Sequence, residues 1–383
     1  MSWRASKPKE QKMLFISDWL NQEMPIAELC RCYNISRKTG YKLIHRYQEE
    51  EQEAFNEKSR ARHNISNQIP PEVVSEILAL KQKYLYFGPR KIRLRLMEKY
   101  SENHCPAIST VGEILKRHGL VRPRKYRRHV EPYSEPFATC HSSNQVWSAD
   151  FKGKFRLGNS RHCYPLTITD NYSRFLLTCQ GMYRPTLKET KEHFEKAFYL
   201  YGLPDVIKTD NGTPFAGNGT AGLSQLSIWW LKLGIVPERI DLGCPEQNGR
   251  HERMHRTLKE ATTKPPKLNL RQQQQRFDAF IQEFNHERPH EALNDKYPGD
   301  VYTTSKRILP SKLPEISYPN HMEVRLVRSN GEIKWEGKKY FMSELLYGEP
   351  IGIEQIDEAK IAIYFSKLKI KVVDLKSDEH VRS

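Results

Sequence analysis

Apolar residues recur at helical spacing through the first third of the chain and at strand spacing after it. Residues 25–33 and 37–47 each carry apolar side chains three and four positions apart, and Asn34-Ile35-Ser36 separates the two runs. This spacing predicts two helices joined by a short turn, with Ser36 as a favourable N-cap for the second. The pattern is typical of a helix-turn-helix, although an ordinary helical hairpin shows the same spacing.

Three further helices are predicted between residues 71 and 120. The first starts at Pro71, the second covers the basic stretch 88–100, and the third covers 107–120. In the third, Thr110 and Glu113 have the spacing of a capping box. These helices predict a second helix-turn-helix.

From residue 146 the pattern changes to strands that alternate with helices. Three apolar strands are predicted in succession, followed by helix, strand, helix, strand and a long final helix. This order predicts a mixed sheet with helices on both faces. The predicted ranges are 146–157, 162–174, 175–183, 187–202, 205–212, 223–234, 235–240 and a helix that begins near 248.

The last part of the chain, 321–375, has strand spacing throughout. An Asn330-Gly331 pair predicts a hairpin turn within it. About five strands are expected, and together they predict a small SH3-like β-barrel. Polar linkers then divide the chain into four predicted domains, at 1–55, 66–130, 140–305 and 318–376.

The net charge of the chain and its distribution indicate the kind of partner that it binds. The 383 residues carry a formal net charge of +16, the pI is about 9.4 and the mean hydropathy is −0.74. Residues 1–130 hold 26 Lys and Arg against 14 Asp and Glu, so most of the excess lies in the first third. Such a distribution favours a polyanionic partner, nucleic acid first, over a merely well-solvated surface.

The candidate DNA contacts are basic and aromatic side chains in the two helical modules and in the segment that follows them. The segment 122–129 is predicted to track phosphates as a basic arm, and it also serves as a linker. The predicted contacts are Arg37, Lys38, Tyr41, Lys42, Arg90, Lys91, Arg122, Arg124, Lys125, Arg127 and Arg128.

Cellular location follows from what the sequence lacks. It has no apolar run long enough to span a membrane and no apolar stretch near the N-terminus that would indicate secretion. Seven scattered Cys without a C-x-x-C spacing favour free thiols in a reducing compartment. We therefore expect a cytoplasmic, nucleoid-associated bacterial protein that has no membrane partner.

Two acids interrupt apolar strands and predict a metal site. Asp150 lies within the first predicted strand of the mixed sheet, and Asp210 ends a later one, just before Asn211-Gly212. A buried carboxylate is costly without a partner. Mg²⁺ prefers oxygen ligands, and phosphoryl chemistry that uses two metals needs several converging carboxylates.

If the strands of Asp150 and Asp210 are neighbours, both acids reach one edge of the sheet. The third carboxylate should then come from a helix that packs beside this edge. Glu252 fits, because positions 252, 255, 256 and 259 share one helical face. Glu246 in the preceding loop is a rival, and Asp170 is another that could instead pair with Arg174. Basic side chains beside the acids are predicted to contact the phosphates of the substrate: Lys152, His255, Arg256 and Lys259.

Three stretches together carry a family resemblance. The sequences VWSADFKGKF, IKTDNGTPF and CPEQNGRHERMHRTLKE resemble the three catalytic blocks of the retroviral-integrase-like DDE transposases. Residues 284–302 resemble the block that follows them in bacterial insertion sequences, and the whole chain is most similar to transposases of the insertion-sequence 481 type. Unlike the retroviral relatives, the chain has no His-His-Cys-Cys zinc module at its N-terminus.

The resemblance implies a multidomain α and α/β fold. It consists of N-terminal helix-turn-helix modules, a ribonuclease-H-like mixed-sheet catalytic core and a small C-terminal β-barrel. It also implies that Asp150, Asp210 and Glu252 are the catalytic metal ligands and hold two Mg²⁺ ions per site, with Mn²⁺ able to substitute.

The implied activity is DNA cleavage and strand transfer at the terminal inverted repeats of an insertion sequence. The implied partners are double-stranded DNA, from the element's ends and the target, and further copies of the chain, at least as a dimer. Two other functions fit much of the same sequence. One is a DNA-binding regulator or inactive domesticated relative, and the other is a metal-dependent nuclease that only hydrolyses.

Overall fold

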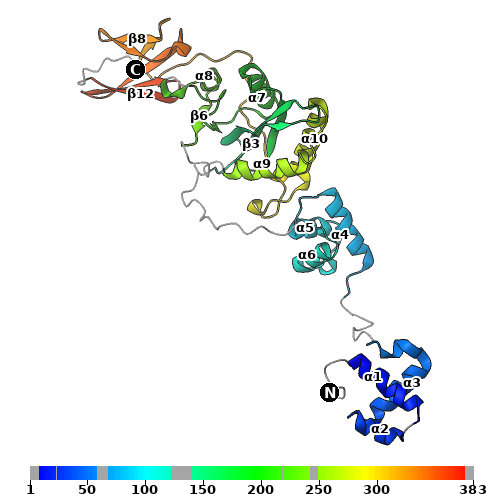
Figure 1. Cartoon of the computed structure of the whole chain (residues 1–383). Coiled ribbons are helices and arrows are strands. Elements are labelled where there is room, and N and C mark those ends of the chain that lie inside the picture. Colours follow the sequence, from blue (N-terminus) through cyan, green and yellow to red (C-terminus); the bar gives the residue numbers. More distant parts are fainter. Residues whose placement is uncertain are drawn as a thin grey trace. The chain divides into compact units, whose positions relative to one another are not determined.

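A computed structural model describes the chain over residues 8–22, 24–57, 68–121, 140–217, 220–241 and 249–375. It divides into two compact units, residues 1–69 and 70–383 (Figure 1). No helix in the described part of the chain is both long and apolar enough to cross a membrane.

The first unit is a small helical domain that contains the two helices and the short turn predicted between residues 25 and 47. Ser36 caps α3 as predicted, because its side chain accepts a hydrogen bond from the Thr39 N–H at 3.1 Å. The helices cross closely at Gly40, where a Cβ would lie 2.5 Å from Cys30 Sγ. The helices are α1 (Pro8–Leu20), α2 (Ile26–Cys32) and α3 (Arg37–Glu50), followed by a 3₁₀ turn, η1 (Glu51–Phe55).

The second unit begins with the three predicted helices of the next module. The capping box predicted at Thr110 and Glu113 is wrong, because the third helix has Ala107 at its N-cap and no side-chain cap. Thr110 therefore lies inside the first turn. The elements are α4 (Pro71–Lys83), α5 (Pro89–Met97), η2 (Glu102–His104) and α6 (Ile108–Arg117).

A mixed sheet follows, in the order β4-β3-β1-β5-β6, with β2 on β3. β3 is antiparallel to β1 and β4, whereas β1, β5 and β6 run parallel. This is the ribonuclease-H-like arrangement that was predicted. The strands are β1 (Val146–Phe151), β2 (Phe155–Arg156), β3 (His162–Asp170), β4 (Leu176–Met182), β5 (Val206–Thr209) and β6 (Val236–Arg239).

Helices cover both faces of this sheet. Phe194, Phe198 and Trp230 from α7 and α8 share one apolar cluster with Trp147 of β1. Met254, Leu258 and other residues of α9 and α10 form a second cluster with the opposite side chains of β3 and β4. The elements are α7 (Leu187–Tyr201), η3 (Thr220–Gly222), α8 (Gln225–Lys232), α9 (Gly249–Thr262), α10 (Leu270–Gln282), η5 (Glu283–Glu287), η6 (Glu291–Leu293) and α11 (Pro298–Val301).

The C-terminal strands form two sheets, β12-β11-β10-β7 and β8-β9. The hairpin turn predicted at Asn330-Gly331 is confirmed, because the Gly331 N–H donates to the Arg328 carbonyl at 2.9 Å and the Arg328 N–H donates to the Glu332 carbonyl at 2.8 Å. In the described ladders β7 pairs with β10 and β8 with β9. Both sheets share one apolar cluster with α8, and closure into a barrel is not shown. The elements are β7 (Glu323–Leu326), β8 (Glu332–Trp335), β9 (Lys338–Phe341), η7 (Glu344–Leu346), β10 (Pro350–Asp357), β11 (Lys360–Phe365) and β12 (Leu368–Asp374).

Asn285 completes the hydrogen bonding of the edge strand β4, and we expect its loss to destabilise the core. Its amide is buried, accepts from the Leu176 N–H at 2.8 Å and donates to the Leu176 carbonyl at 3.0 Å. Asn285→Ala leaves both buried backbone groups unpaired and should lower the free energy of unfolding by about 3 kcal/mol.

Urea unfolding followed by tryptophan fluorescence measures this change, because Trp147, Trp229 and Trp230 lie in the core. The same substitution at Asn159, which is exposed, is the control and should change stability by less than about 0.5 kcal/mol. Equal stability of the two variants would contradict the assigned role of Asn285.

Candidate active site

The pairing of β1 with β5 brings two of the predicted acids to one edge of the sheet. These strands are parallel, and the last pair in their register is Ser148 with Lys208. Asp150 and Asp210 each lie two residues further along, so they occupy equivalent positions on adjacent strands. The carboxyl ends of neighbouring parallel strands are a common place for functional side chains.

A tight turn orients the carboxylate of Asp210. Its Oδ1 accepts a hydrogen bond from the Gly212 N–H at 3.1 Å, which is an Asx-turn. The Asn211 side chain donates to the Ile240 carbonyl at 2.9 Å and so ties the turn to the residue after β6. The Asp-Asn-Gly triplet therefore places one carboxylate and anchors the loop that carries it.

Helix α9 lies across the sheet and carries the third predicted acid. Its buried face includes His251, Met254, His255 and Leu258. Glu252 is on the exposed side of the helix, together with Arg256 and Lys259.

The prediction that His255 shares the exposed face is wrong. Its ring is buried against β3, which leaves Glu252, Arg256 and Lys259 as the exposed group. Successive residues of a helix are rotated by about 100°, so His255 lies only about 60° from Glu252, at the border of the two faces.

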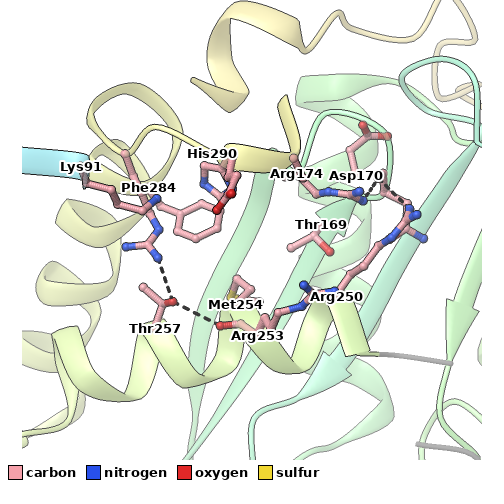
Figure 2. Close-up of a pocket in the computed structure, with 14 residues that line it drawn as sticks. Lys91, Thr169, Asp170, Arg174, Arg250, Arg253, Met254, Thr257, Phe284 and His290 are labelled. Atoms are coloured by element: carbon pink, nitrogen blue, oxygen red, sulfur yellow. Dashed lines mark hydrogen bonds between the residues drawn. The ribbon is translucent and has the colours of Figure 1, made fainter. Parts of the chain in front are cut away.

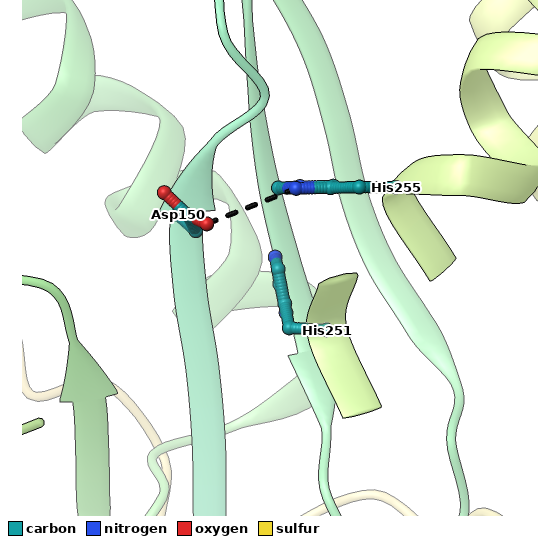
Figure 3. Close-up of side chains that lie close together, drawn as sticks. All are labelled: Asp150, His251 and His255. Atoms are coloured by element: carbon teal, nitrogen blue, oxygen red, sulfur yellow. Dashed lines mark ion pairs between the residues drawn. The ribbon is translucent and has the colours of Figure 1, made fainter. Parts of the chain in front are cut away.

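Two histidines and two threonines hold α9 against the sheet. His251 Nε2 and His255 Nε2 each lie 2.7 Å from Thr167 Oγ1, and His251 Nδ1 lies 3.0 Å from Thr169 Oγ1. Figure 3 shows the two histidine side chains beside Asp150. Thr167 Oγ1 also lies 3.1 Å from the Asp150 carbonyl oxygen, to which it donates. The hydroxyl of Thr167 thus links three elements: β3, α9 and the strand β1 that carries Asp150.

Both imidazoles are neutral in this setting. Burial lowers the pKa of His251 to about 3 and the pKa of His255 far below its ordinary value. The distances fit rings that carry their proton on Nε2 and donate it to Thr167, while the Thr169 hydroxyl donates to His251. The 3.7 Å contact of His255 Nδ1 with Asp150 Oδ2 therefore joins a neutral ring to the carboxyl group.

The charges of Asp210 and Glu252 both act on the carboxyl group of Asp150. Burial raises the pKa of Asp150 to about 7, and the neighbouring charges of Asp210 and Glu252 add to the rise. Lys152 lies in the same field: burial and Lys259 lower its pKa, while Asp150 and Glu252 raise it. A cation placed among the three carboxylates would relieve their mutual repulsion.

Two ligand sets share Asp150, and they differ in chemistry. One is Asp150 with His251 and His255, whose nearest ligand atoms lie within 4.8 Å of one another. It fits a metal poorly, since both nitrogens of His251 already have threonine partners. The other set is the predicted one, Asp150, Asp210 and Glu252, whose side chains offer only oxygen, the ligand atom that Mg²⁺ and Mn²⁺ prefer. Among the described residues, only the first set has its ligand atoms within 4.8 Å of one another.

Of the two rival acids, the structure describes Asp170 but not Glu246. Asp170 is fully buried at the opposite end of the β1–β3 ladder, where it pairs with Trp147. Its carboxylate accepts hydrogen bonds from the Asn144 N–H and from the Ser173 N–H and hydroxyl, so it has a structural role. Glu246 lies outside the described residues.

The predicted DNA contacts fall into separate groups. Arg37, Lys38, Tyr41 and Lys42 are all exposed on α3, and Lys152 is half-buried. The residues of the basic arm lie outside the described part of the chain: Arg122, Arg124, Lys125, Arg127 and Arg128.

Arg90 and Lys91 are instead engaged within the second unit. Arg90 forms ion pairs of 2.8 Å with Glu291 and with Asp295, and Lys91 Nζ donates to the Pro289 carbonyl. They help to dock α5 on the segment that follows α10. Arg90 remains exposed in these pairs and Lys91 is half-buried, so their contact with DNA stays a prediction.

Sequence reasoning missed Thr167, Thr169 and His251. The four-residue spacing of His251 and His255 on a helix was the available signal, because it places both rings on one face. Nothing in the pattern of β3 marks its threonines as their partners.

Comparison with known proteins gives the class of this site. Residues 141–243 and 233–298 match two family profiles, both described as an integrase core domain. The chain thus contains an integrase core domain, and the acids above lie within it.

The relatives are an insertion-element protein and retroviral polyproteins, of which this chain is a distant homologue. It is 25% identical over 234 residues to an uncharacterized 31.7 kDa protein of insertion element IS407 from Burkholderia multivorans, covering 60% of this chain and 82% of that protein. It is 27% identical over 201 residues to the Gag-Pol polyprotein of Koala retrovirus, covering 51% of this chain and 11% of the polyprotein. The chain therefore spans about a tenth of that retroviral relative.

The solved structures that this chain matches include integrases. The HTLV-2 integrase catalytic core domain in complex with magnesium is 20% identical, with a TM-score of 0.34, and covers 42% of this chain and 98% of that chain. A simian T-cell lymphotropic virus intasome is 17% identical, with a TM-score of 0.39, and covers 78% of this chain and 96% of that chain.

Proposed function

We propose that this protein is a DNA transposase of the insertion-sequence 481 type, which cuts the ends of its element and joins them to target DNA. The observation that supports the proposal most is the β1–β5 register, which puts Asp150 and Asp210 at equivalent positions on adjacent strands. The charges of Asp210 and Glu252 both act on Asp150. Together the three acids would form the oxygen-rich site that metal-dependent phosphoryl transfer requires.

In this mechanism the chain positions DNA and neutralises charge. Asp150, Asp210 and Glu252 would hold two Mg²⁺ ions, which supply Lewis-acid activation of the attacking oxygen and stabilise the leaving one. The Asx-turn fixes Asp210 before DNA binds, and the histidine–threonine contacts fix the helix that carries Glu252. Lys152, Arg256 and Lys259 stand beside the acids and attract DNA phosphates.

The reaction has two steps at one site. Water first attacks a phosphodiester at the element's end, and the released 3′ hydroxyl then attacks a phosphodiester of the target strand. Each step forms one P–O bond and breaks another, so no protein nucleophile is needed. Catalysis then depends on positioning and electrostatic stabilisation.

Other parts of the chain would bind and pair the two ends. The exposed residues of α3 would contact the terminal inverted repeat in the major groove, and the C-terminal sheets would form an SH3-like barrel. Joining two ends at once requires at least a dimer of this chain on DNA.

The test is an assay of the full chain with a labelled duplex that carries the element's end, a plasmid target and Mg²⁺. We expect nicked ends and joined products, both abolished by EDTA and restored by added Mg²⁺ or Mn²⁺. Nicking without joined products would instead indicate a hydrolytic nuclease. Binding without any metal-dependent cleavage would indicate a DNA-binding regulator and would overturn the proposal.

A further inference from the structure

A second site of unusual charge lies beside α9 (Figure 2). A half-open cavity of about 310 Å³ is lined by α9, the end of β3, the segment after α10 and one residue of α5. Its cationic lining consists of Lys91, Arg174, Arg250, Arg253 and Arg288, with His290 beside them.

The carboxylates that line this cavity do not balance the five cations. They are Asp170 and Glu291. Asp170 already accepts hydrogen bonds from three donors, and Glu291 is paired with Arg90 at 2.8 Å. The lining therefore holds more basic than acidic side chains, while Glu283 and Glu260, which are outside the lining, also act on Arg288.

The cations repel one another at a measurable cost. Burial and the charges of Arg250 and Arg253 lower the pKa of Arg174 to about 10. Burial and the charge of Arg288 lower the pKa of Lys91 to about 7, against the opposing effect of Asp295 and Glu291. Arginine nevertheless stays charged at neutral pH, so this repulsion persists until an anion enters.

Polar side-chain atoms in the same cavity also lack partners. The Nε and Nη1 groups of Arg288, which are donors, and the Nε2 of His290, which donates or accepts according to the tautomer, are buried and have no hydrogen-bond partner in the described part of the chain. The Nη2 of Arg288 reaches Thr257 Oγ1 only at 3.4 Å. Buried polar groups are normally satisfied, and a group left unpaired often marks a missing ligand.

We propose that this cavity binds a phosphate group, held between α5 and α9. Guanidinium groups match phosphate oxygens with paired, charge-assisted hydrogen bonds. The group would also tie the helical module α4–α6 to the core, since Lys91 belongs to the former and Arg250 and Arg253 to the latter. That it comes from a DNA backbone rests on the proposed function, whereas the phosphate binding itself does not.

The first test titrates inorganic phosphate into the full chain by calorimetry, against chloride at equal ionic strength. Wild type should bind, and the double variant Arg250→Gln with Arg253→Gln should bind at least tenfold more weakly. Arg271→Gln is the matched control, because Arg271 is exposed on α10, and it should bind as wild type does. Equal affinity of the double variant and wild type, or no binding by wild type, would overturn the proposal.

Thermal unfolding in chloride buffer separates a binding role from a structural one. Because the charge of Arg253 repels Arg174, the single variant Arg253→Gln should unfold at the wild-type temperature or above it. Unfolding at a clearly lower temperature would show that Arg253 stabilises the fold without an anion, and the proposal would fail.

A third arm identifies the source of the phosphate. Duplexes that carry one uncharged methylphosphonate at successive positions are bound to wild type and to the double variant. If the modification at one position lowers the DNA affinity of wild type but not that of the double variant, the site binds a DNA phosphate. If no position does so and inorganic phosphate still binds, the site binds free phosphate. If phosphate binding is lost in the double variant but wild type joins no DNA, only the proposed function is rejected.

Discussion

The Asp210→Asn variant should bind end DNA as tightly as wild type and yet cleave and join it at least about 10³-fold more slowly. Asparagine keeps the oxygen that accepts the Gly212 N–H, so the Asx-turn and the β5–β6 edge should stay intact. What is lost is one negative charge of the three that act together at Asp150. The reaction would then lose metal affinity and charge stabilisation, while folding and DNA contacts persist.

Single-turnover cleavage measures this loss, and a gel-shift measurement on the same duplex reports binding. Asp278→Asn provides the control, because Asp278 is an exposed acid on α10 outside the proposed site. It should cleave at the wild-type rate. Near wild-type cleavage by Asp210→Asn would remove Asp210 from the site and with it the main argument for a transposase.

Glu252→Gln should cause a loss of similar size, and Glu246→Gln should not. Glu252 has the position to act, since its charge reaches both Asp150 and Lys152 and α9 is fixed by two buried histidines. Glutamine preserves the length of the side chain and its helix propensity, so the helix should stay in place.

The pair of variants decides between the two acids directly. Cleavage by both is measured on the same substrate, with Mg²⁺ and with Mn²⁺ in excess, because a weakened site is partly rescued by a more tightly bound ion. Loss of activity in Glu246→Gln, with Glu252→Gln active, would reverse the assignment. The β1–β5 part of the site would remain.

The order of elements in the core was predictable because apolar spacing and turn residues agree there. The strands around Asp150 and Asp210 are bounded by clear turn signals, and both acids interrupt apolar runs. The two strands are parallel neighbours, and each acid lies the same number of residues past the last pair of their register. This is why two acids that are 60 residues apart in the chain could be paired from the sequence alone.

Other features depend on contacts that spacing does not encode. His255 sits at the border of two helical faces, and only the threonines of β3 decide which way it points. Arg90 and Lys91 were predicted as DNA contacts because they lie in a strongly basic helix. Their partners within the chain lie 198 to 205 residues away in sequence, so local spacing could not reveal them.

The contact of two imidazoles with one threonine hydroxyl also gives the protein a built-in spectroscopic reporter. A buried ring N–H that is hydrogen-bonded exchanges slowly with water and gives its own proton resonance, apart from the backbone amides. His251 and His255 share Thr167, so both signals should respond when β1, β3 or α9 shifts. Magnetic resonance of these two protons would thus follow the assembly of the catalytic geometry in inactive variants, in which no reaction can be observed.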